Sequence, residues 1–294
     1  MKLIDGKKIA ADLLGEIARE VNLLTAQGKR PPHLATVLVG HDEASETYVA
    51  NKVRACHNCG FDATVVRHDV DVTQDELLAT IDRLNRDESI DGFIVQLPLP
   101  DHIDEQRIIE AIDYRKDVDG FHPINVGRLA LGLPCFPTAT PQGIATLLDR
   151  CHISTEGKHC VVLGNDHIVG RPTAELLMRK AFPGNCAVTV CNGDTPHLED
   201  LTRRADILIA AIGIPHFVKA HMVKDGAVVI DAGTTRLPSE DSPGHYRLHG
   251  DVDFDAVAPK CAFITPVPGG VGPMTVVSLL KNTLLAATRP ALLS

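Results

Sequence analysis

The sequence predicts an α/β protein with two domains, an N-terminal α/β domain followed by a Rossmann-type nucleotide-binding domain. Short apolar runs alternate with amphipathic, helix-like segments along the chain, which is typical of parallel β-α-β units. The chain has 294 residues, 44% of them hydrophobic, which is enough for two cores. We expect the crossing between the domains near the proline-bounded stretch Pro137 to Pro141.

Composition narrows the functional classes. The formal net charge is −9 and the isoelectric point is about 5.8, and no basic tract is present, so we expect no nucleic-acid partner. The lack of Trp removes an aromatic platform for single-stranded nucleic acid. The first residues contain no signal-peptide core and no apolar run is long enough to cross a bilayer. We therefore expect a cytoplasmic protein without a membrane partner.

The eight cysteines are scattered, as expected for reduced thiols in the cytosol. Cys56 and Cys59 form the only tight pair, and no second pair follows at zinc spacing. We interpret this pair as helix packing and expect no metal site.

Periodicity predicts the elements of the first domain in order. A long amphipathic helix should run from Gly6 to Gly28, where a glycine suits a C-terminal cap. Thr73 and Glu76 have capping-box spacing at the start of a later helix. The other expected elements are strands at 33–40, 63–70 and 93–100, a helix from about 45 towards 60, a short helix at 108–112 and a helix at 142–151.

The most suggestive stretch of the first domain runs from Ser45 to Lys52. On a helix, Ser45, Tyr48 and Lys52 are spaced i, i+3, i+7 and share one face. A phenol and an amine just beyond a strand are suited to proton transfer. For an isolated pair the simpler interpretation is that Tyr48 packs while Lys52 keeps its ammonium in water. The polar groups elsewhere in the chain favour the functional interpretation.

Gln96 adds a buried amide. It lies inside the apolar run 93–100, where an amide without partners costs roughly 2 kcal/mol or more. Ligands of open α/β sheets bind beyond the carboxyl ends of the strands, and Pro98 ends this strand close to Gln96. We predict that Gln96 contacts a ligand or Lys52; the alternative is an amide satisfied by local backbone.

Two carboxylates follow in the stretch Lys116 to Gly120. The acids that a calcium loop needs at Arg115 and Val126 are missing, so we reject an EF-hand. Alone, the stretch is typical of a solvated turn. Its candidate role is to supply a carboxylate that holds a polar heterocycle.

The second domain opens with a strand at 159–163, a glycine-bounded loop from Gly164 to Pro172, and a helix. This order places a helix N-terminus where a pyrophosphate can bind. The loop is not Gly-x-Gly-x-x-Gly, so the motif alone is weak. Three more apolar strands are expected at 187–190, 206–212 and 227–232, and together they make a Rossmann-type domain the leading interpretation.

The last signal is the block from Thr265 to Thr275, which is followed by an apolar helix. Its prolines restrict the backbone, and its glycines leave room for close approach of a ligand. A loop that packs against a flat ligand requires both. A proline-stiffened connector is the simpler alternative. The three glycines before the helix favour the functional one.

Taken together, these stretches resemble the bifunctional methylenetetrahydrofolate dehydrogenase/cyclohydrolase family, called FolD in bacteria, nearly from end to end. The resemblance rests on Tyr48-x-x-x-Lys52, Val95 to Pro100, Lys116 to Gly120, Ile168-Val169-Gly170-x-Pro172, Gly250-Asp251-Val252 and Thr265 to Thr275. It implies a folate-binding domain over 1–138, a nucleotide-binding domain over 139–273, and a C-terminal helix over 274–294 that returns to the first domain. It also implies a homodimer formed through the nucleotide domain.

The resemblance implies two reactions at one site. A hydride leaves methylenetetrahydrofolate for NAD(P)+, and water then opens the methenyl product to formyltetrahydrofolate. Lys52 is the implied acid/base group, tuned by Gln96, while Tyr48 lines the folate site and Asp119 holds the pterin. The implied substrate-binding set also contains Val95, Leu97, Asp117, Pro268, Gly269 and Gly270.

The implied cofactor is NADP or NAD. The nucleotide-binding residues carried over are Gly164, Asn165, Asp166, Val169, Gly170, Gly193, Asp194, Gly213, Thr234, Gly272 and Thr275. The family default is NADP, but the family usually reads Gly-Arg-Ser at 164–166 and His-Ser-Lys-Thr at 192–195. Here the arginine and serine that grip the 2′-phosphate are absent and two aspartates are present. The local sequence therefore favours NAD.

Other classes stay open at this point. A two-domain dehydrogenase of a small acid or amino acid would need a His/carboxylate couple or an arginine clamp, and no such constellation stands out. A cyclohydrolase-only enzyme, or a folate-binding homologue with an impaired nucleotide site, would follow if the changes at Asn165, Asp166 and Asp194 abolished nucleotide binding. The intact motifs of the first domain weigh against a complete loss of activity.

Overall fold

The computed structural model describes residues 1–238 and 246–289. Contacts divide the chain into two units, which we name after their main sheets. The three-stranded unit comprises Asp12–Ala139 and Val276–Ser294, and the six-stranded unit comprises Met1–Ala11 and Thr140–Thr275. Both main sheets are parallel with helices between the strands, so the predicted α/β class is confirmed.

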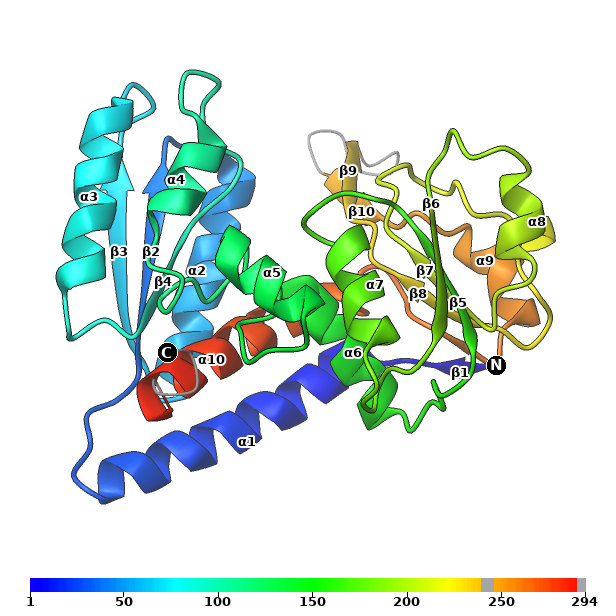
Figure 1. The fold of residues 1–294 in the computed structure, drawn as a ribbon, viewed down its shortest axis with the longest axis horizontal. Helices are drawn as coiled ribbons and strands as arrows, with labels where there is room; N and C mark the ends of the chain where they lie inside the picture. Colours follow the sequence, from blue (N-terminus) through cyan, green and yellow to red (C-terminus); the bar gives the residue numbers. More distant parts are fainter. Residues whose placement is uncertain (239–245, 290–294) are drawn as a thin grey trace. The chain divides into compact units, whose positions relative to one another are not determined.

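In the three-stranded unit the strands lie in the order β3-β2-β4 (Figure 1). The strands are β2 (His33–Val39), β3 (Asp62–His68) and β4 (Gly92–Val95). The helices are α2 (Glu43–Asn58), α3 (Gln74–Arg86), α4 (Glu105–Ala111), α5 (Pro123–Ala130) and most of α1 (Gly6–Ala26) and α10 (Gly272–Thr288).

Strand β2 is buried on both faces. Val37 and Val39 pack in a core with Leu77 and Ile81 of α3, while alternate residues such as Leu38 point to the other face and are also buried. This is the burial that a continuous apolar run indicates in a parallel sheet. The carboxyl end of this buried strand leads through a short connection, residues 40–42, into α2.

Local signals set the helix ends. Gly28 follows α1 with φ of 78°, and its N–H bonds the carbonyl of Thr25, which confirms the predicted glycine cap. The capping box is also confirmed, since Thr73 Oγ1 accepts the N–H of Glu76 while Glu76 accepts the N–H of Thr73. Asp42 caps α2 by accepting the N–H of Ser45 at 2.8 Å.

The six-stranded unit has the order β1-β11-β8-β7-β5-β6. Its strands are β1 (Lys2–Leu3), β5 (His159–Leu163), β6 (Ala187–Cys191), β7 (Ile207–Ala210), β8 (Val228–Asp231) and β11 (Phe263–Ile264), and β9 (Thr235–Pro238) pairs separately with β10 (Tyr246–His249). The helical segments are α6 (Ala139–Arg150), α7 (Gly170–Met178), α8 (Leu198–Thr202), η1 (Ala220–Met222), α9 (Phe254–Val257) and η2 (Ala258–Lys260).

Strand β5 marks the point where the strand order reverses. The chain passes from β5 to β6 on one side and then to β7 on the other (Figure 1). Open α/β sheets bind ligands outside the carboxyl ends of the strands at such a point. The loop after β5, which begins at Gly164, lies there.

Three expectations need correction. The strand predicted at 93–100 ends at Val95, so Gln96 follows the strand instead of lying inside it. Helix α5, which begins at Pro123, was not among the expected elements. The division differs from the predicted one at the N-terminus, where β1 pairs with β11 and carries Met1–Ala11 into the six-stranded unit.

Two further expectations concern the C-terminal helix and membranes. The helix predicted over 274–294 is α10, which ends at Thr288, and residues 290–294 lie outside the described residues. Among the helices of the described ranges, none is long and apolar enough to cross a membrane. All eight cysteines are thiols.

Candidate active site and nucleotide pocket

Lys52 and Gln96 meet in the three-stranded unit. Lys52 lies in the third turn of α2, and Gln96 follows β4, whose end is fixed because the N–H of Gln96 bonds Val37 O at 2.9 Å. The Nζ of Lys52 donates a hydrogen bond to Oε1 of Gln96 at 3.0 Å, while Nε2 of Gln96 donates to Leu97 O at 2.7 Å. The amide therefore makes the predicted contact with Lys52 and also the local-backbone contact of the alternative interpretation. A role of Gln96 in tuning Lys52 stays a prediction.

The electrostatic setting of Lys52 favours its neutral form. Burial lowers the pKa of Lys52, and the charge of Asp119 opposes that effect. Burial likewise raises the pKa of Asp119, against the attraction of Lys52. A lysine with a lowered pKa can accept a proton nearer neutral pH than a free lysine can. The pair can therefore serve as an acid/base centre.

The two aspartates of the Lys116 to Gly120 stretch have different surroundings. Asp117 is buried, and its oxygens accept hydrogen bonds from the N–H groups of Gly120 and His122 and from Nδ2 of Asn125 at 2.8–3.1 Å. These internal donors occupy Asp117, so the geometry gives it the role of holding the turn. Asp119 accepts no hydrogen bond from the described residues, so its acceptors stay open.

The remaining predicted residues of this unit lie nearby. Val95, Leu97, Asp117 and Asp119 line one small cavity of about 10 Å³ together with apolar side chains of α4. Tyr48 lies one turn before Lys52 on α2, and its side chain is 46% exposed, so it is open to a ligand and is not packed in the core.

Pro268, Gly269 and Gly270 belong to the six-stranded unit. The carbonyl of Gly269 accepts the N–H of Lys7 at 3.0 Å, which ties the loop to the start of α1. A Cβ on Gly270 would lie 2.5 Å from Pro266 O, so this turn has no room for a side chain. Pro268 lines a cavity of about 590 Å³ with His216, Tyr246 and other residues. Their role as folate ligands stays a prediction.

A pocket of about 590 Å³ opens at the carboxyl ends of β5, β6, β7 and β8. It is lined by seven of the predicted nucleotide-binding residues, Gly164, Asn165, Asp166, Val169, Asp194, Gly213 and Thr234. The lining also includes Asn192, Ala211, Ile212, Ala232, Gly233, Thr235 and Asp251, which were not predicted. Most of these lie at or just after the carboxyl ends of the predicted strands, so their position at strand ends was the available signal.

The remaining predicted nucleotide residues do not line this pocket. Gly170 packs behind it, where a Cβ would lie 2.2 Å from Gly164 O, the close helix–strand packing that only glycine allows. Thr275 Oγ1 lies 3.2 Å from Thr140 Oγ1, and Gly272 opens α10. Gly193 lies on the loop after β6 and is exposed.

The pocket fits a dinucleotide in its backbone shape. Gly164 has φ of 133°, and a Cβ there would lie 2.0 Å from Ala211 O, so the loop passes β7 as closely as bare backbone permits. Helix α7 begins at Gly170, directly after the loop. Such a glycine turn leading into a helix is the arrangement that holds the phosphates of a nucleotide.

Asp166 modifies this loop. Its Oδ1 accepts the N–H groups of Ile168 and Val169 at 2.9 and 2.7 Å, and its Oδ2 accepts that of Gly170 at 3.2 Å. The carboxylate is thereby fixed at the start of α7, where the helix dipole stabilises negative charge. The predicted aspartate therefore places a carboxylate of fixed position in the lining of the pocket.

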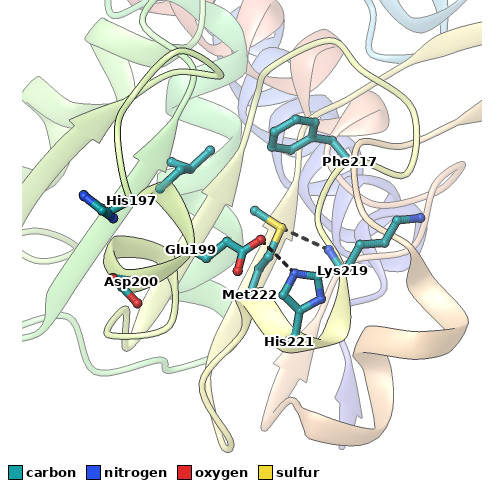
Figure 2. A pocket seen from close by; sticks show the side chains of 8 residues that line it. His197, Glu199, Asp200, Phe217, Lys219, His221 and Met222 are labelled. Atoms are coloured by element: carbon teal, nitrogen blue, oxygen red, sulfur yellow. Dashed lines mark hydrogen bonds and ion pairs between the residues drawn. The ribbon is translucent and has the colours of Figure 1, made fainter.

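Another hollow, of about 580 Å³, lies between α8 and η1 (Figure 2). Glu199 and His221 point toward each other across it, with Oε1 and Nε2 at 3.0 Å. Nζ of Lys219 is paired with Asp253 at 3.1 Å. Glu199, His221 and Lys219 therefore each have a partner, and none of the predicted site residues lines the hollow.

Comparisons with known proteins show the family of the chain. The catalytic domain of the tetrahydrofolate dehydrogenase/cyclohydrolase family matches residues 4–119, and the NAD(P)-binding domain of the same family matches residues 138–291. The bifunctional protein FolD of Bacteroides fragilis is 61% identical over 289 residues, which cover 98% of this chain and 99% of that protein.

Two solved structures are similar over nearly their whole length. The bifunctional FolD of Campylobacter jejuni is 45% identical with a TM-score of 0.91, and 98% of each chain is covered. The methylenetetrahydrofolate dehydrogenase-cyclohydrolase of Trypanosoma brucei, solved in complex with NADP and an inhibitor, is 39% identical with a TM-score of 0.93, again over 98% of each chain. The chain therefore belongs to the tetrahydrofolate dehydrogenase/cyclohydrolase family.

Proposed function

We propose that this chain oxidises methylenetetrahydrofolate with a nicotinamide dinucleotide and hydrolyses the methenyl product to formyltetrahydrofolate, with Lys52 as the acid/base group. The observation that supports it most is the hydrogen bond from Lys52 Nζ to Gln96 Oε1 at 3.0 Å, in a setting that lowers the lysine pKa. The rival assignment to a dehydrogenase of small acids is not retained, because the family match spans both halves of the chain.

The residues divide the chemistry as follows. Bound NAD(P)+ supplies the hydride acceptor for the first reaction. In the second, the neutral amine of Lys52 takes a proton from the water that adds to the methenyl carbon, and returns a proton to the ring nitrogen as the carbon–nitrogen bond breaks. Gln96 holds the amine in position, and Asp119 stabilises its protonated form by charge. Asp119 also offers open acceptors to the pterin N–H groups.

We further propose that the dehydrogenase prefers NAD to NADP. A 2′-phosphate in this pocket would meet the fixed carboxylate of Asp166 and the nearby Asp194, and Asn165 supplies no cation. Two like unit charges about 4 Å apart repel by roughly 1 kcal/mol in bulk water and by more near a protein surface. Arg171, an exposed residue of α7, is a candidate to offset this repulsion, although it does not line the pocket.

The test is a titration of the purified protein with NAD and with NADP in the presence of methylenetetrahydrofolate. We expect both activities and a ratio of kcat/KM for NAD over NADP above one. The double change Asn165→Arg, Asp166→Ser should raise kcat/KM for NADP. The variant Arg171→Ala shows whether Arg171 contributes to NADP binding. A wild-type ratio well below one, or a double variant that gains nothing with NADP, would contradict the cofactor proposal; absence of both activities would contradict the function.

We also propose a cytoplasmic homodimer formed through the six-stranded unit. The proposal is supported by the family resemblance and by apolar side chains exposed on the β9–β10 pair, Leu237 and Tyr246, at 36% and 60%. Light scattering should give twice the 31.7 kDa mass of the chain. The mass of a single chain at micromolar concentration would rule the dimer out.

A further inference from the structure

Two buried carboxylates lie beside the nucleotide pocket, and the proposed reactions give neither a role. Asp231 is the last residue of β8 and is 3% exposed, and Asp251, just before α9, is 0% exposed. Burying a charge is costly unless hydrogen bonds compensate, so two such residues in one place need an explanation.

Asp231 joins three segments of backbone. Its Oδ1 accepts the N–H groups of Gly233 and Asp251, both at 2.9 Å, and its Oδ2 accepts the N–H of Val252 at 3.0 Å. Its own N–H donates to Thr265 Oγ1 at 2.7 Å. Asp231 therefore holds the backbone of Asp251 in place and connects it with the start of the Pro268 loop.

Asp251 in turn holds the wall of the nucleotide pocket. Its Oδ2 accepts the N–H groups of Ile212 and Gly213 at 2.7 and 2.9 Å, in the turn that follows β7. A trans peptide directs its N–H and C=O to opposite sides. The hydrogen bonds to Asp251 therefore decide where the carbonyls of Ala211 and Ile212 point, and both residues line the pocket.

The turn after β7 in turn contacts the loop after β5, which begins at Gly164. The carbonyl of Ala211 lies so close to Gly164 that a Cβ on that glycine would approach it to 2.0 Å. Asp251 also leaves no room on its other side, since a Cβ on Gly233 would lie 2.3 Å from Oδ1, an oxygen with no hydrogen-bond partner in the described chain. A change at Asp251 is thus transmitted to the β7 turn and to the loop after β5.

We propose that Asp231 and Asp251 are positioning residues for nucleotide use, which set the backbone of the pocket wall between β7 and β8 without taking part in the hydrolysis of the methenyl intermediate. This inference rests on the proposed function. It gives a role to the Gly250-Asp251-Val252 motif. It also predicts that a substitution at Asp251 lowers the dehydrogenase activity while the cyclohydrolase activity is retained.

The main test compares Asp251→Ala, Asp251→Asn and Asp253→Ala. Binding of NAD and NADP is measured by calorimetry, and the dehydrogenase, the cyclohydrolase and the melting temperature are measured alongside. We expect Asp251→Ala to weaken binding of the preferred dinucleotide at least tenfold, with the cyclohydrolase rate within twofold of wild type. Asp251→Asn should recover most of the affinity, because one amide oxygen can still accept both N–H groups.

Asp253→Ala is the matched control. Asp253 lies two residues further along, pairs with Lys219 and does not line the nucleotide pocket, so its loss should leave nucleotide affinity unchanged. Asp231→Asn acts one step further from the pocket and should weaken nucleotide binding at least threefold, again sparing the cyclohydrolase. It decides the question independently if Asp251→Ala fails to fold.

Nucleotide affinity within twofold of wild type in Asp251→Ala, or in Asp231→Asn where only that variant folds, overturns the proposal. So does an equal fall of both activities in Asp251→Asn and Asp231→Asn, since that indicates a general role in folding. Failure of the proposed function is distinguishable: wild-type protein would then lack dehydrogenase activity, while the calorimetric comparison of the variants would still decide the positioning role.

Discussion

At the scale of single residues, the structure separates groups that the sequence presents as equivalent. Asp117 and Asp119 are two residues apart, yet Asp117 is saturated by internal donors and Asp119 is not. Likewise Asp166 is held by three backbone N–H groups, which fix the position of its carboxyl group in the loop. Spacing indicates that a carboxylate is present, but only the fold shows which acceptors stay open.

This difference gives a prediction for Asp119. Asp119→Ala should weaken binding of a folate analogue by roughly 1–3 kcal/mol, since a charge-assisted hydrogen bond is lost and a buried donor of the ligand stays unpaired. Binding of NAD should not change. Calorimetry measures both, and Asp101→Ala, at an exposed position of the same unit, is the control. Equal folate affinity in Asp119→Ala and wild type would remove Asp119 from the site.

At the scale of elements, the α3 capping box offers a test of local stability. Thr73→Ala removes the oxygen that accepts the N–H of Glu76, and should lower the free energy of unfolding by about 1 kcal/mol. Thr73→Ser should restore most of the loss. The comparison is made by urea unfolding, and a Thr73→Ala variant as stable as wild type would show that the cap contributes nothing.

The end of β8 gives a prediction for pH. Burial raises the pKa of Asp231 from 3.8 to about 6, despite the hydrogen bonds from Asp251, Val252 and Gly233 that favour the ionised form. A raised pKa means that the stability contributed by this group is full below about pH 3.8 and is lost as the pH rises through about 6. An asparagine does not titrate.

The free energy of unfolding of wild type, measured relative to that of Asp231→Asn, should therefore fall as the pH rises from 4 to 7. The shift is at most about 3 kcal/mol, because one pKa unit corresponds to about 1.4 kcal/mol. Urea unfolding of both proteins at matched pH values measures it. A difference that stays constant or moves the other way would show that Asp231 is ionised throughout this range.

The elements that could be predicted from the sequence are those whose hydrophobic pattern repeats over many residues. The α1 helix and the strands buried on both faces repeat their pattern over many residues, and Gly28 and Thr73 mark helix ends by local chemistry alone. Strands of two residues, such as β1 and β11, have no periodicity to detect. Strand β4 ends at Val95, five residues before the predicted end at Pro100, because an apolar run does not show where the strand stops.

The site was predicted unevenly for the same reason. Lys52, Gln96 and Asp119 belong to motifs with chemical side chains, which a sequence reveals directly. Much of the pocket wall consists of backbone at strand ends, as at Ile212 and Gly233, and side-chain identity says little about it. Asp251 was part of a recognised motif but had no role, since its hydrogen bonds join segments 38 and 39 residues apart.

At the scale of the whole molecule, family membership and the two units give a consistent account. The six-stranded unit carries the proposed nucleotide pocket, and the three-stranded unit carries the proposed acid/base centre. Changes in the nucleotide pocket should therefore affect the dehydrogenase selectively. A change at Lys52 should affect the cyclohydrolase, which needs no dinucleotide.

The most direct test of this account is the cyclohydrolase rate of Lys52→Met at saturating methenyltetrahydrofolate, with folate affinity measured on the same protein. Methionine keeps the apolar stem of the side chain but can neither accept nor return a proton. We expect the rate to fall at least a hundredfold while folate still binds, with Lys8→Met, an exposed lysine of the other unit, as the control. A Lys52→Met variant that hydrolyses methenyltetrahydrofolate near the wild-type rate would contradict the central assignment.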